Sequence, residues 1–207
     1  MKIQHLNHTF PYIIIDDFYN QEECSLIWEE LTFLCYPCKL ERSSIERGGA
    51  HVGGDLLKFT NDTYLDSFYS KREYSNILNL NRKVFNNHEK IFFAHNSWFF
   101  KNISFNIDYT QVVYYEDNDE YKAHQDCSLV TCLTWFYREP KKFNGGNLYF
   151  PEYDLEIEVL NNRMIIFPSV IIHTAKKVSM SEENRNKKLG RFCISQFLLS
   201  QMFVNKN

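Results

Sequence analysis

The segment Gln111–Phe136, QVVYYEDNDEYKAHQDCSLVTCLTWF, decides how the second half of the chain is organised. It contains three short stretches that predict strands, which are Gln111–Tyr115, Tyr121–Gln125 and Leu129–Phe136, and the first and third are rich in β-branched and aromatic residues. Polar residues separate the first two, and Asn118 among them can take the left-handed backbone conformation that a tight turn needs. The segment therefore predicts three consecutive strands with no helix between them.

The same pattern continues toward the C-terminus. Five further stretches predict strands, which are Asn147–Phe150, Ile157–Val159, Met164–Phe167, Ile172–Val178 and Phe192–Leu198. Turn residues such as Asn144-Gly145-Gly146 and Asn161-Asn162 lie between them. Eight short strands without intervening helices favour a β-sandwich or a jelly-roll barrel.

The N-terminal half has a different pattern. A short strand is predicted at Tyr12–Ile15, and Asn20 with Glu23 forms a capping-box pattern that begins a helix with one apolar face. A second helix is predicted at Ser75–Phe85. We expect residues 1–207 to form a single domain, in which residues 1–97 supply an N-terminal strand, supporting helices and a glycine-rich loop, and residues 98–207 supply the β core.

The glycine-rich loop spans Arg42–Asp55. Four of the seven glycines of the chain lie in it, which are Gly48, Gly49, Gly53 and Gly54. Clustered glycine gives a mobile backbone. The loop is either an ordinary surface loop or a flap over an active site.

The composition limits the classes of protein to consider. Of the 207 residues, 44% are hydrophobic and 24% are charged, so the chain is globular rather than disordered. The net charge of −3 gives no basic footprint for nucleic acid, and no secretory signal or membrane-spanning apolar run is seen. We therefore expect a cytoplasmic protein with reduced cysteines, in which the pair Cys35 and Cys38 at a helix end is incidental rather than a zinc or redox site.

The chemistry centres on His124-Gln125-Asp126. Residues two apart on a strand point to the same side, so His124 and Asp126 can coordinate one metal ion. His173, on a later strand, can complete the set. Two imidazoles and one carboxylate, with open positions opposite, are the ligands of non-haem iron(II) oxygenases.

These motifs resemble those of the iron(II)- and 2-oxoglutarate-dependent dioxygenases, in particular the prolyl hydroxylase branch. The similarity runs from about Gln111 to Phe197 and is carried by four motifs, which are Tyr121-Lys-Ala-His124-Gln-Asp126, Val130-Thr-Cys-Leu-Thr-Trp-Phe136, Gly145-Gly-Asn-Leu-Tyr-Phe-Pro151 and Gly190-Arg191-Phe-Cys-Ile-Ser-Gln-Phe197. The resemblance implies a double-stranded β-helix (jelly-roll) core, with Fe(II), 2-oxoglutarate and O2 as cofactors and ascorbate as a reductant in assays.

The resemblance also assigns roles to residues. Arg191 would bind the distal carboxylate of 2-oxoglutarate, since arginine offers a bidentate cation that stays charged. The other residues expected around 2-oxoglutarate are Tyr115 or Tyr114, Ser195, Thr131 and Leu133. The substrate-pocket candidates are Tyr121, Trp135, Leu148, Ala175 and Phe197. Alternation along the last strand predicts that Arg191, Cys193, Ser195 and Phe197 face the barrel interior.

One spacing departs from the family. His173 and Arg191 are 18 residues apart, about twice the usual separation. We expect the excess, Ser179–Lys188, to form a longer hairpin between the last two strands. It also introduces rival cations, which are Lys176, Arg185 and Lys188.

The expected activity is hydroxylation of an aliphatic carbon with release of succinate and CO2. The resemblance favours a prolyl or other amino-acid side chain in a peptide or protein, and a free amino acid or small metabolite is the nearest alternative. Nucleobase repair is disfavoured because Phe197 stands where that group has a second arginine, and halogenation because Asp126 is present. A non-catalytic jelly-roll metal-binding module is the alternative from another class.

Overall fold

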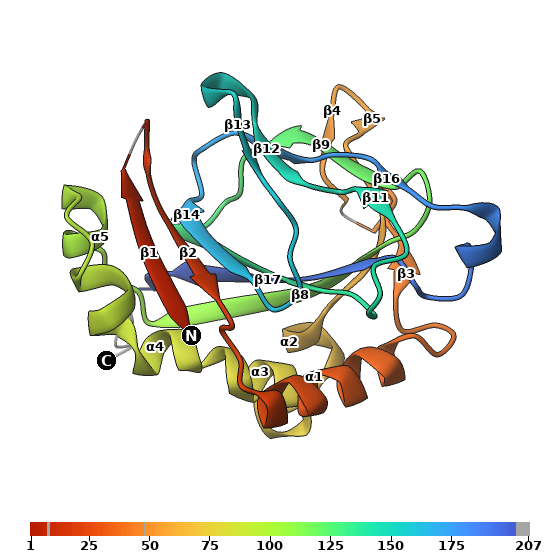
Figure 1. The fold of residues 1–207 in the computed structure, drawn as a ribbon, viewed down its shortest axis with the longest axis horizontal. Coiled ribbons are helices and arrows are strands. Elements are labelled where there is room, and N and C mark those ends of the chain that lie inside the picture. Colours follow the sequence, from red (N-terminus) through yellow and green to blue (C-terminus); the bar gives the residue numbers. More distant parts are fainter. Residues whose placement is uncertain (8, 48, 202–207) are drawn as a thin grey trace, which may run out of the picture.

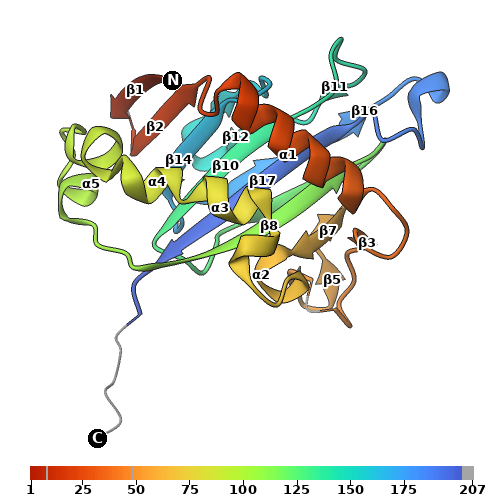
Figure 2. The same cartoon turned by 90° about the horizontal axis from the view of Figure 1, so that it is seen from below.

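The computed structural model describes residues 1–7, 9–47 and 49–201. Two antiparallel sheets face each other, and the helices cover the outer face of the larger sheet (Figure 1). Seen from below, α1 and α3 cross the long strands of that sheet (Figure 2). The predicted jelly-roll architecture, mainly β with N-terminal helices, is confirmed.

The larger sheet has eight strands. In spatial order they are β1 (Lys2–Asn7), β2 (Pro11–Asp16), β14 (Met164–Pro168), β10 (Val130–Phe136), β17 (Arg191–Leu199), β8 (Ile107–Tyr115), β7 (Asn61–Tyr64) and β3 (Glu41–Arg42). The long ladder between β8 and β17 pairs Arg191 with Tyr115 and Ser195 with Gln111. This ladder forms the floor of the site described below.

The smaller sheet has five strands. In order they are β13 (Leu155–Ile157), β12 (Leu148–Phe150), β15 (His173–Ala175), β9 (Glu120–His124) and β6 (Lys58–Phe59). Two further pairs are β11 (Asn144–Gly145) with β16 (Val178–Ser179), and β4 (His51–Val52) with β5 (Asp55–Leu56). All eight predicted strands of the second half are present, with shifted ends.

Five α-helices are present among the described residues, and α1 (Gln21–Leu34) begins as predicted. The side chain of Asn20 accepts from the Glu23 amide at 2.8 Å, and Glu23 accepts from the Asn20 amide at 2.7 Å. The other helices are α2 (Leu65–Phe68), α3 (Asn76–Asn81), α4 (Lys83–Asn86) and α5 (Trp98–Asn102). Single turns are η1 (Arg72–Tyr74), η2 (Glu89–Phe93), η3 (Pro151–Tyr153) and η4 (Glu182–Asn184). No described helix is long and apolar enough to cross a membrane.

The predicted helix Ser75–Phe85 is divided in two. Ser75 caps α3 as its N-terminal residue, but the helix tightens and ends at Arg82, whose amide bonds to the Asn79 carbonyl at 3.2 Å. Three of the six residues of α3 are asparagines, which form helices poorly. The asparagine side chain at position 81 instead bonds to Tyr19 and Thr110.

The predicted hairpin at Ser179–Lys188 is wrong. The strands on either side of this segment, β15 and β17, lie in different sheets, as consecutive strands of a jelly roll do. The segment crosses from one sheet to the other through β16 and the turn η4. The extra residues therefore lengthen a crossover and do not extend a pair of strands.

The hydrophobic core has two layers. One lies between the helices and the larger sheet and contains Ile27, Phe92 and Phe136. The other lies between the two sheets and contains Trp135 and Phe167. Since β10 is buried on both faces, neighbouring residues such as Trp135 and Phe136 belong to different layers.

Candidate active site

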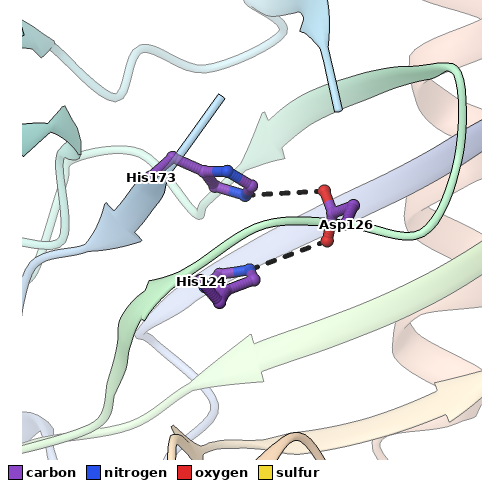
Figure 3. A group of neighbouring side chains, drawn as sticks. All are labelled: His124, Asp126 and His173. Carbon is purple, nitrogen blue, oxygen red and sulfur yellow. Dashed lines mark ion pairs between the residues drawn. The ribbon is translucent and has the colours of Figure 1, made fainter. Parts of the chain in front are cut away.

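The three predicted metal ligands meet at the end of the smaller sheet. His124 ends β9, His173 begins β15, and the two residues are paired across the ladder. Asp126 follows β9 by two residues, and its carboxylate lies between the two imidazoles (Figure 3). Its oxygens are 3.7 Å from Nε2 of His124 and 3.5 Å from Nε2 of His173. One ligand atom from each residue lies within 4.8 Å of the other two, so the group could hold a metal ion.

Both histidines are oriented through their other ring nitrogen. Nδ1 of His124 is 2.8 Å from the Lys122 carbonyl, and Nδ1 of His173 is 3.0 Å from the Ile171 carbonyl. A carbonyl only accepts, so Nδ1 carries the proton and leaves Nε2 free for a metal. Burial lowers the pKa of His124 to about 3 and also lowers the pKa of His173. The imidazoles are therefore held neutral, which is the form that coordinates a metal.

The Asp126 carboxylate is fixed by neighbouring polar groups. The hydroxyl of Thr131 donates to Oδ2 at 2.6 Å, and the amide of Asp126 donates to the Ser169 carbonyl at 3.0 Å. Thr131 was expected beside 2-oxoglutarate, but it does not line the cavity next to the triad. Its position on β10 directs its hydroxyl to Asp126 instead.

A cavity of about 240 Å³ adjoins the triad between the two sheets. Its walls include most of the side chains predicted for the site, which are His124, Asp126, His173, Arg191, Tyr115, Ser195, Leu133, Tyr121, Trp135, Leu148, Ala175 and Phe197. Tyr121 stacks on His124, with ring centroids 3.5 Å apart and an interplanar angle of 10°. All four β17 residues predicted to face the interior, including Cys193, line this cavity.

Arg191 is buried at the far end of the ladder, with only 1% of its surface exposed. Nη1 donates to the Gly146 carbonyl, and the guanidinium lies 3.9 Å from the centre of the Tyr115 ring. Nε is buried without a hydrogen-bond partner among the described residues. A buried donor of a permanently charged group without an acceptor indicates space for an anion.

A glycine allows the chain to pass this point. A Cβ atom on Gly190 would lie 2.1 Å from the Tyr115 carbonyl oxygen, so only glycine fits between β17 and β8 here. The close approach brings the start of β17 against Tyr115. Gly190 therefore fixes the position of Arg191.

The two candidate tyrosines lie on opposite faces of β8. Tyr115 lines the cavity, whereas Tyr114 does not. The Tyr114 hydroxyl donates to Glu116 at 2.8 Å and accepts from the Gly190 amide at 3.1 Å. Adjacent strand residues point to opposite faces, so only one of the pair can reach the cavity. Burial raises the pKa of Tyr115, so its hydroxyl stays protonated as a donor.

None of the rival cations of the crossover lines the cavity. Lys176 pairs with Glu156, and Arg185 pairs with Asp117 at 3.0 Å. Lys188 lies 4.7 Å from the centre of the Tyr114 ring, on the helix side.

Several residues of the cavity were not predicted from the sequence, and three of them form a buried polar group. Lys58, Asp62 and Gln111 line its other end and are all buried. Nζ of Lys58 lies 2.8 Å from Oε1 of Gln111 and 3.2 Å from Oδ2 of Asp62. Burial lowers the pKa of Lys58, and the carboxylate of Asp62 opposes that shift. The available signal was a lone lysine inside the apolar run Leu56-Leu57-Lys58-Phe59.

Part of the glycine-rich loop also borders the cavity, through Ser43, Ser44, Arg47, Gly49 and Ala50. The remainder forms the small β4–β5 hairpin. Gly48 lies outside the described residues. Closure of this loop over a bound ligand stays a prediction.

Comparisons with known proteins agree with this geometry. Residues 110–198 match the model of the 2OG-Fe(II) oxygenase superfamily, and this range contains the triad and Arg191. No curated protein matches the chain in sequence.

Solved structures are similar in fold at low identity. A prolyl-4-hydroxylase from Pseudomonas putida has a TM-score of 0.61 at 10% identity, covering 92% of this chain and 93% of that one. A viral collagen prolyl hydroxylase from Paramecium Bursaria Chlorella virus-1, in complex with 2-oxoglutarate, has a TM-score of 0.56 at 15% identity, covering 92% and 96%. An oxidoreductase of the 2OG-Fe(II) oxygenase family from Burkholderia pseudomallei has a TM-score of 0.61 at 12% identity, covering 91% and 84%.

Motif order, site geometry and fold lead to the same assignment. Residues 110–198 carry the pattern of the 2OG-Fe(II) oxygenase superfamily, whose cofactors are Fe(II), 2-oxoglutarate and O2, and the fold of the chain is similar to that of prolyl hydroxylases.

Proposed function

We propose that His124, Asp126 and His173 hold the iron(II), and that Arg191 with Tyr115 holds the distal carboxylate of 2-oxoglutarate. The observation that carries this proposal is that one cavity contains both groups. At one place two neutral imidazoles present Nε2 beside a carboxylate, and at another a buried guanidinium has an unpartnered Nε. The first set suits iron(II), and the second suits a carboxylate.

The charges of these residues support the assignment. Arg191 has no carboxylate partner among the described residues, although it is almost fully buried. An anion that enters the cavity would compensate this charge, and the protonated Tyr115 hydroxyl could donate to the same anion. Arg191 therefore discriminates 2-oxoglutarate from keto acids that lack a second carboxylate.

Bound iron(II) with 2-oxoglutarate supplies the oxidising chemistry, in which O2 is consumed, 2-oxoglutarate becomes succinate and CO2, and a substrate C–H becomes C–OH. The residues of the chain bind and orient the participants. Thr131 holds the Asp126 carboxylate, and the backbone carbonyls of Lys122 and Ile171 hold the imidazoles. Leu133, Trp135 and Leu148 form an apolar wall that excludes water.

We propose that the substrate is a prolyl or other amino-acid side chain within a peptide or protein. The similar structures named for prolyl-4-hydroxylase and collagen prolyl hydroxylase support this choice. A free amino acid or small metabolite is the alternative. We further propose that the whole chain acts as one domain, because residues before position 98 supply strands to both sheets.

Metal analysis tests the triad. Protein reconstituted with iron(II) should bind about one ion per chain, and His124→Ala and His173→Ala should each reduce binding to a small fraction of that value. The matched control is His88→Ala, since His88 packs against Phe92 and Phe105 on the helix side of the sheet. If both triad variants kept the full iron content, the assignment would be wrong.

Succinate release tests the activity. With iron(II), ascorbate and O2, the wild type should convert 2-oxoglutarate slowly to succinate without any added substrate, and a suitable substrate should accelerate this conversion. No succinate from iron-loaded protein, with or without candidate substrates, would contradict the proposed function.

A further inference from the structure

The cavity has two polar ends, and the proposed function uses only one of them. Arg191 faces Tyr115 at the first end. Lys58, Asp62 and Gln111 form the second end. Gln111 pairs with Ser195, four residues along β17 from Arg191, so the two ends are separated by about 13 Å of strand. A ligand held at the first end therefore leaves the second end available to another molecule.

The second end lies beside the proposed metal ligands. Lys58 on β6 pairs directly with Tyr121 on β9, and its Nζ lies 5.5 Å from the centre of the Tyr121 ring. Tyr121 in turn stacks on His124. A group bound by Lys58 would therefore lie next to the place where the substrate must react.

Lys58 is held in one orientation by its neighbours. It is 5% exposed, and Gln111 and Asp62 accept from its ammonium. Asp62 also accepts from Gln111 Nε2 at 3.0 Å, from Thr60 at 3.3 Å and from Ser43. Asp62 is thus saturated, whereas the ammonium has three N–H groups and has used two. The third is available to the cavity that Lys58 lines.

The charge at this end differs from that at Arg191. Lys58 is already compensated by Asp62 at 3.2 Å, whereas Arg191 has no carboxylate partner among the described residues. Arg47, the other cation that lines the cavity, pairs with Glu41 at 2.8 Å. A second carboxylate beside the Lys58–Asp62 pair would therefore be buried without a cation of its own, which is costly. An uncharged acceptor, such as an amide carbonyl, needs no such compensation.

We propose that Lys58 is a specificity-determining residue that donates its free N–H to an amide carbonyl of the substrate backbone, an inference that rests on the proposed function. Asp62 and Gln111 are positioning residues that direct this N–H. The enzyme then selects an amino-acid side chain that is flanked by peptide bonds, and it rejects the free amino acid, whose carboxylate is charged.

The wild-type enzyme tests this selectivity directly. Twenty N-acetylated, C-amidated tripeptides Ala-X-Ala, in which X is each amino acid, are compared with the twenty free amino acids for stimulation of succinate release. We expect at least one capped tripeptide to stimulate release above the level without substrate, and the matching free amino acid to be at least tenfold weaker in kcat/KM. The proposal would be overturned if only free amino acids stimulated succinate release, or if none of the tripeptides did. Succinate release without any substrate is measured in parallel, and its absence would instead contradict the proposed function.

Two variants assign the selectivity to Lys58. Lys58→Met removes the donor, and the double variant Lys58→Met with Asp62→Asn removes both charges, so that no unpaired carboxylate remains to unfold the protein. A lost hydrogen bond to a charged donor corresponds to about a tenfold to hundredfold effect. We expect KM for the active tripeptide to rise by that factor, while the KM for 2-oxoglutarate changes less than twofold.

The control is Lys90→Met, because Lys90 is exposed on the η2 turn. It should leave both KM values unchanged. Binding of the tripeptide to the manganese-loaded protein, measured by calorimetry, provides a readout that does not depend on turnover, and it should weaken in parallel with KM. Equal KM for the tripeptide in wild type and in a folded double variant would show that Lys58 is only structural.

Discussion

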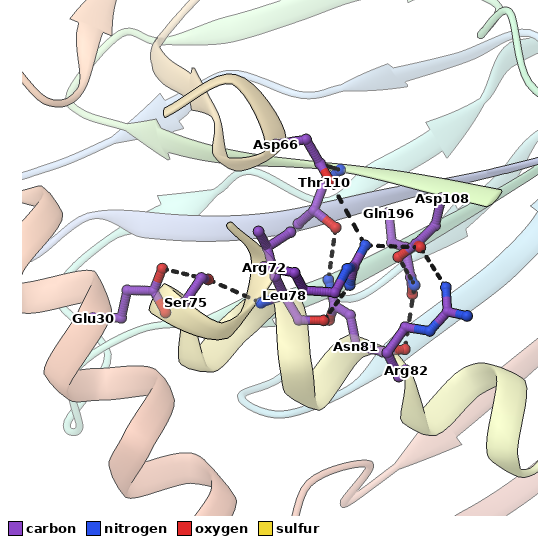
Figure 4. Close-up of polar contacts among 10 residues, drawn as sticks. All are labelled: Glu30, Asp66, Arg72, Ser75, Leu78, Asn81, Arg82, Asp108, Thr110 and Gln196. Carbon is purple, nitrogen blue, oxygen red and sulfur yellow. Dashed lines mark hydrogen bonds and ion pairs between the residues drawn. The ribbon is translucent and has the colours of Figure 1, made fainter. Parts of the chain in front are cut away.

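The ladder between β8 and β17 carries buried polar side chains on both faces, and the two sets are organised differently. On the helix face the donors find acceptors within the protein, and one acceptor, Oε1 of Gln196, has no partner among the described residues. Asp108 accepts from Arg72 at 2.9 Å, from Arg82 at 2.8 Å and from Gln196 at 2.8 Å (Figure 4). On the cavity face, Arg191 keeps an unpartnered Nε. Gln111 on the same face accepts from Lys58 of β6, which keeps an unused N–H.

This difference separates stability from binding. Polar groups that bond to one another contribute to the folded state, and breaking their bonds lowers the free energy of unfolding. Buried donors without acceptors contribute little to the free energy of folding, because their desolvation penalty is not compensated until a ligand binds. Substitutions on the helix face should therefore change stability, and substitutions on the cavity face should change the KM or the affinity for the ligands.

The largest effect is expected for Arg191→Ala. Removing one partner of a buried ion pair costs about 3–5 kcal/mol, which corresponds to a few hundred- to a few thousand-fold. The apparent KM for 2-oxoglutarate, measured by succinate release, should rise by about this factor. Iron binding, measured by metal analysis, should persist. The melting temperature should not fall, because the buried charge that is removed has no carboxylate partner among the described residues.

Arg185→Ala is the matched control for Arg191. Its side chain is 45% exposed and pairs with Asp117 outside the cavity, so it should change the 2-oxoglutarate constant little. If the two variants exchanged behaviour, the assignment of the cosubstrate end would be wrong.

Asp108→Ala is the opposite case on the helix face. The Asp108 side chain is 1% exposed, but its partners Arg72 and Arg82 are 28% and 40% exposed, so solvent reduces the loss. We expect a decrease of about 3 kcal/mol in the free energy of unfolding, from urea denaturation, and a melting temperature lower by roughly 6–12 °C. The constant for 2-oxoglutarate of the folded fraction should stay the same. A large change in that constant would show that the two faces are coupled.

The main effect of Thr131→Val should be on metal binding, although the same hydroxyl also lies 2.9 Å from Oγ of Ser169. The substitution keeps the side-chain volume and removes the hydroxyl that donates to Asp126 at 2.6 Å. Loss of such a supporting hydrogen bond reduces metal affinity by about tenfold to a hundredfold. Titration with iron(II) under anaerobic conditions measures this affinity. Unchanged affinity would mean that Asp126 is fixed well enough by its backbone bond to Ser169.

Local patterns in the sequence predicted much of this arrangement. The Asn20–Glu23 capping box began α1, Asn118 adopts a positive φ of 65° in its turn, and strand alternation placed Arg191, Cys193, Ser195 and Phe197 toward one cavity. Each of these features depends on residues within a few positions of one another. The interactions that determine these features are therefore between residues close together in the sequence, so a short segment is enough to predict them.

Features that depend on distant pairing were not predicted. Strands β6 and β7 are short or polar, and they form only because β9 and β8 offer edges to pair with. Lys58 enters the cavity through one of these strands, and its partner Gln111 is 53 residues away. The crossover at Ser179–Lys188 was interpreted as a hairpin for the same reason, since the sheet to which a strand belongs is a long-range property.

The smallest effects are expected for Tyr114 and Tyr115. These adjacent residues of β8 lie on opposite faces of the ladder, so they compare the helix face with the cavity face directly. Tyr115→Phe removes a hydroxyl from the cavity face and should raise the 2-oxoglutarate constant about threefold to tenfold, as one hydrogen bond contributes about 1 kcal/mol. Tyr114→Phe removes a hydroxyl that donates to Glu116 and accepts from the Gly190 amide. It should instead lower the free energy of unfolding by about 1 kcal/mol and leave the 2-oxoglutarate constant within twofold. Paired measurements of succinate release and urea denaturation on both variants distinguish these outcomes. Tyr114→Phe would weaken 2-oxoglutarate binding as much as Tyr115→Phe does only if Gly190 transmits changes from the helix face to the cavity face. In that case stability and binding would not be separate at this end of the ladder.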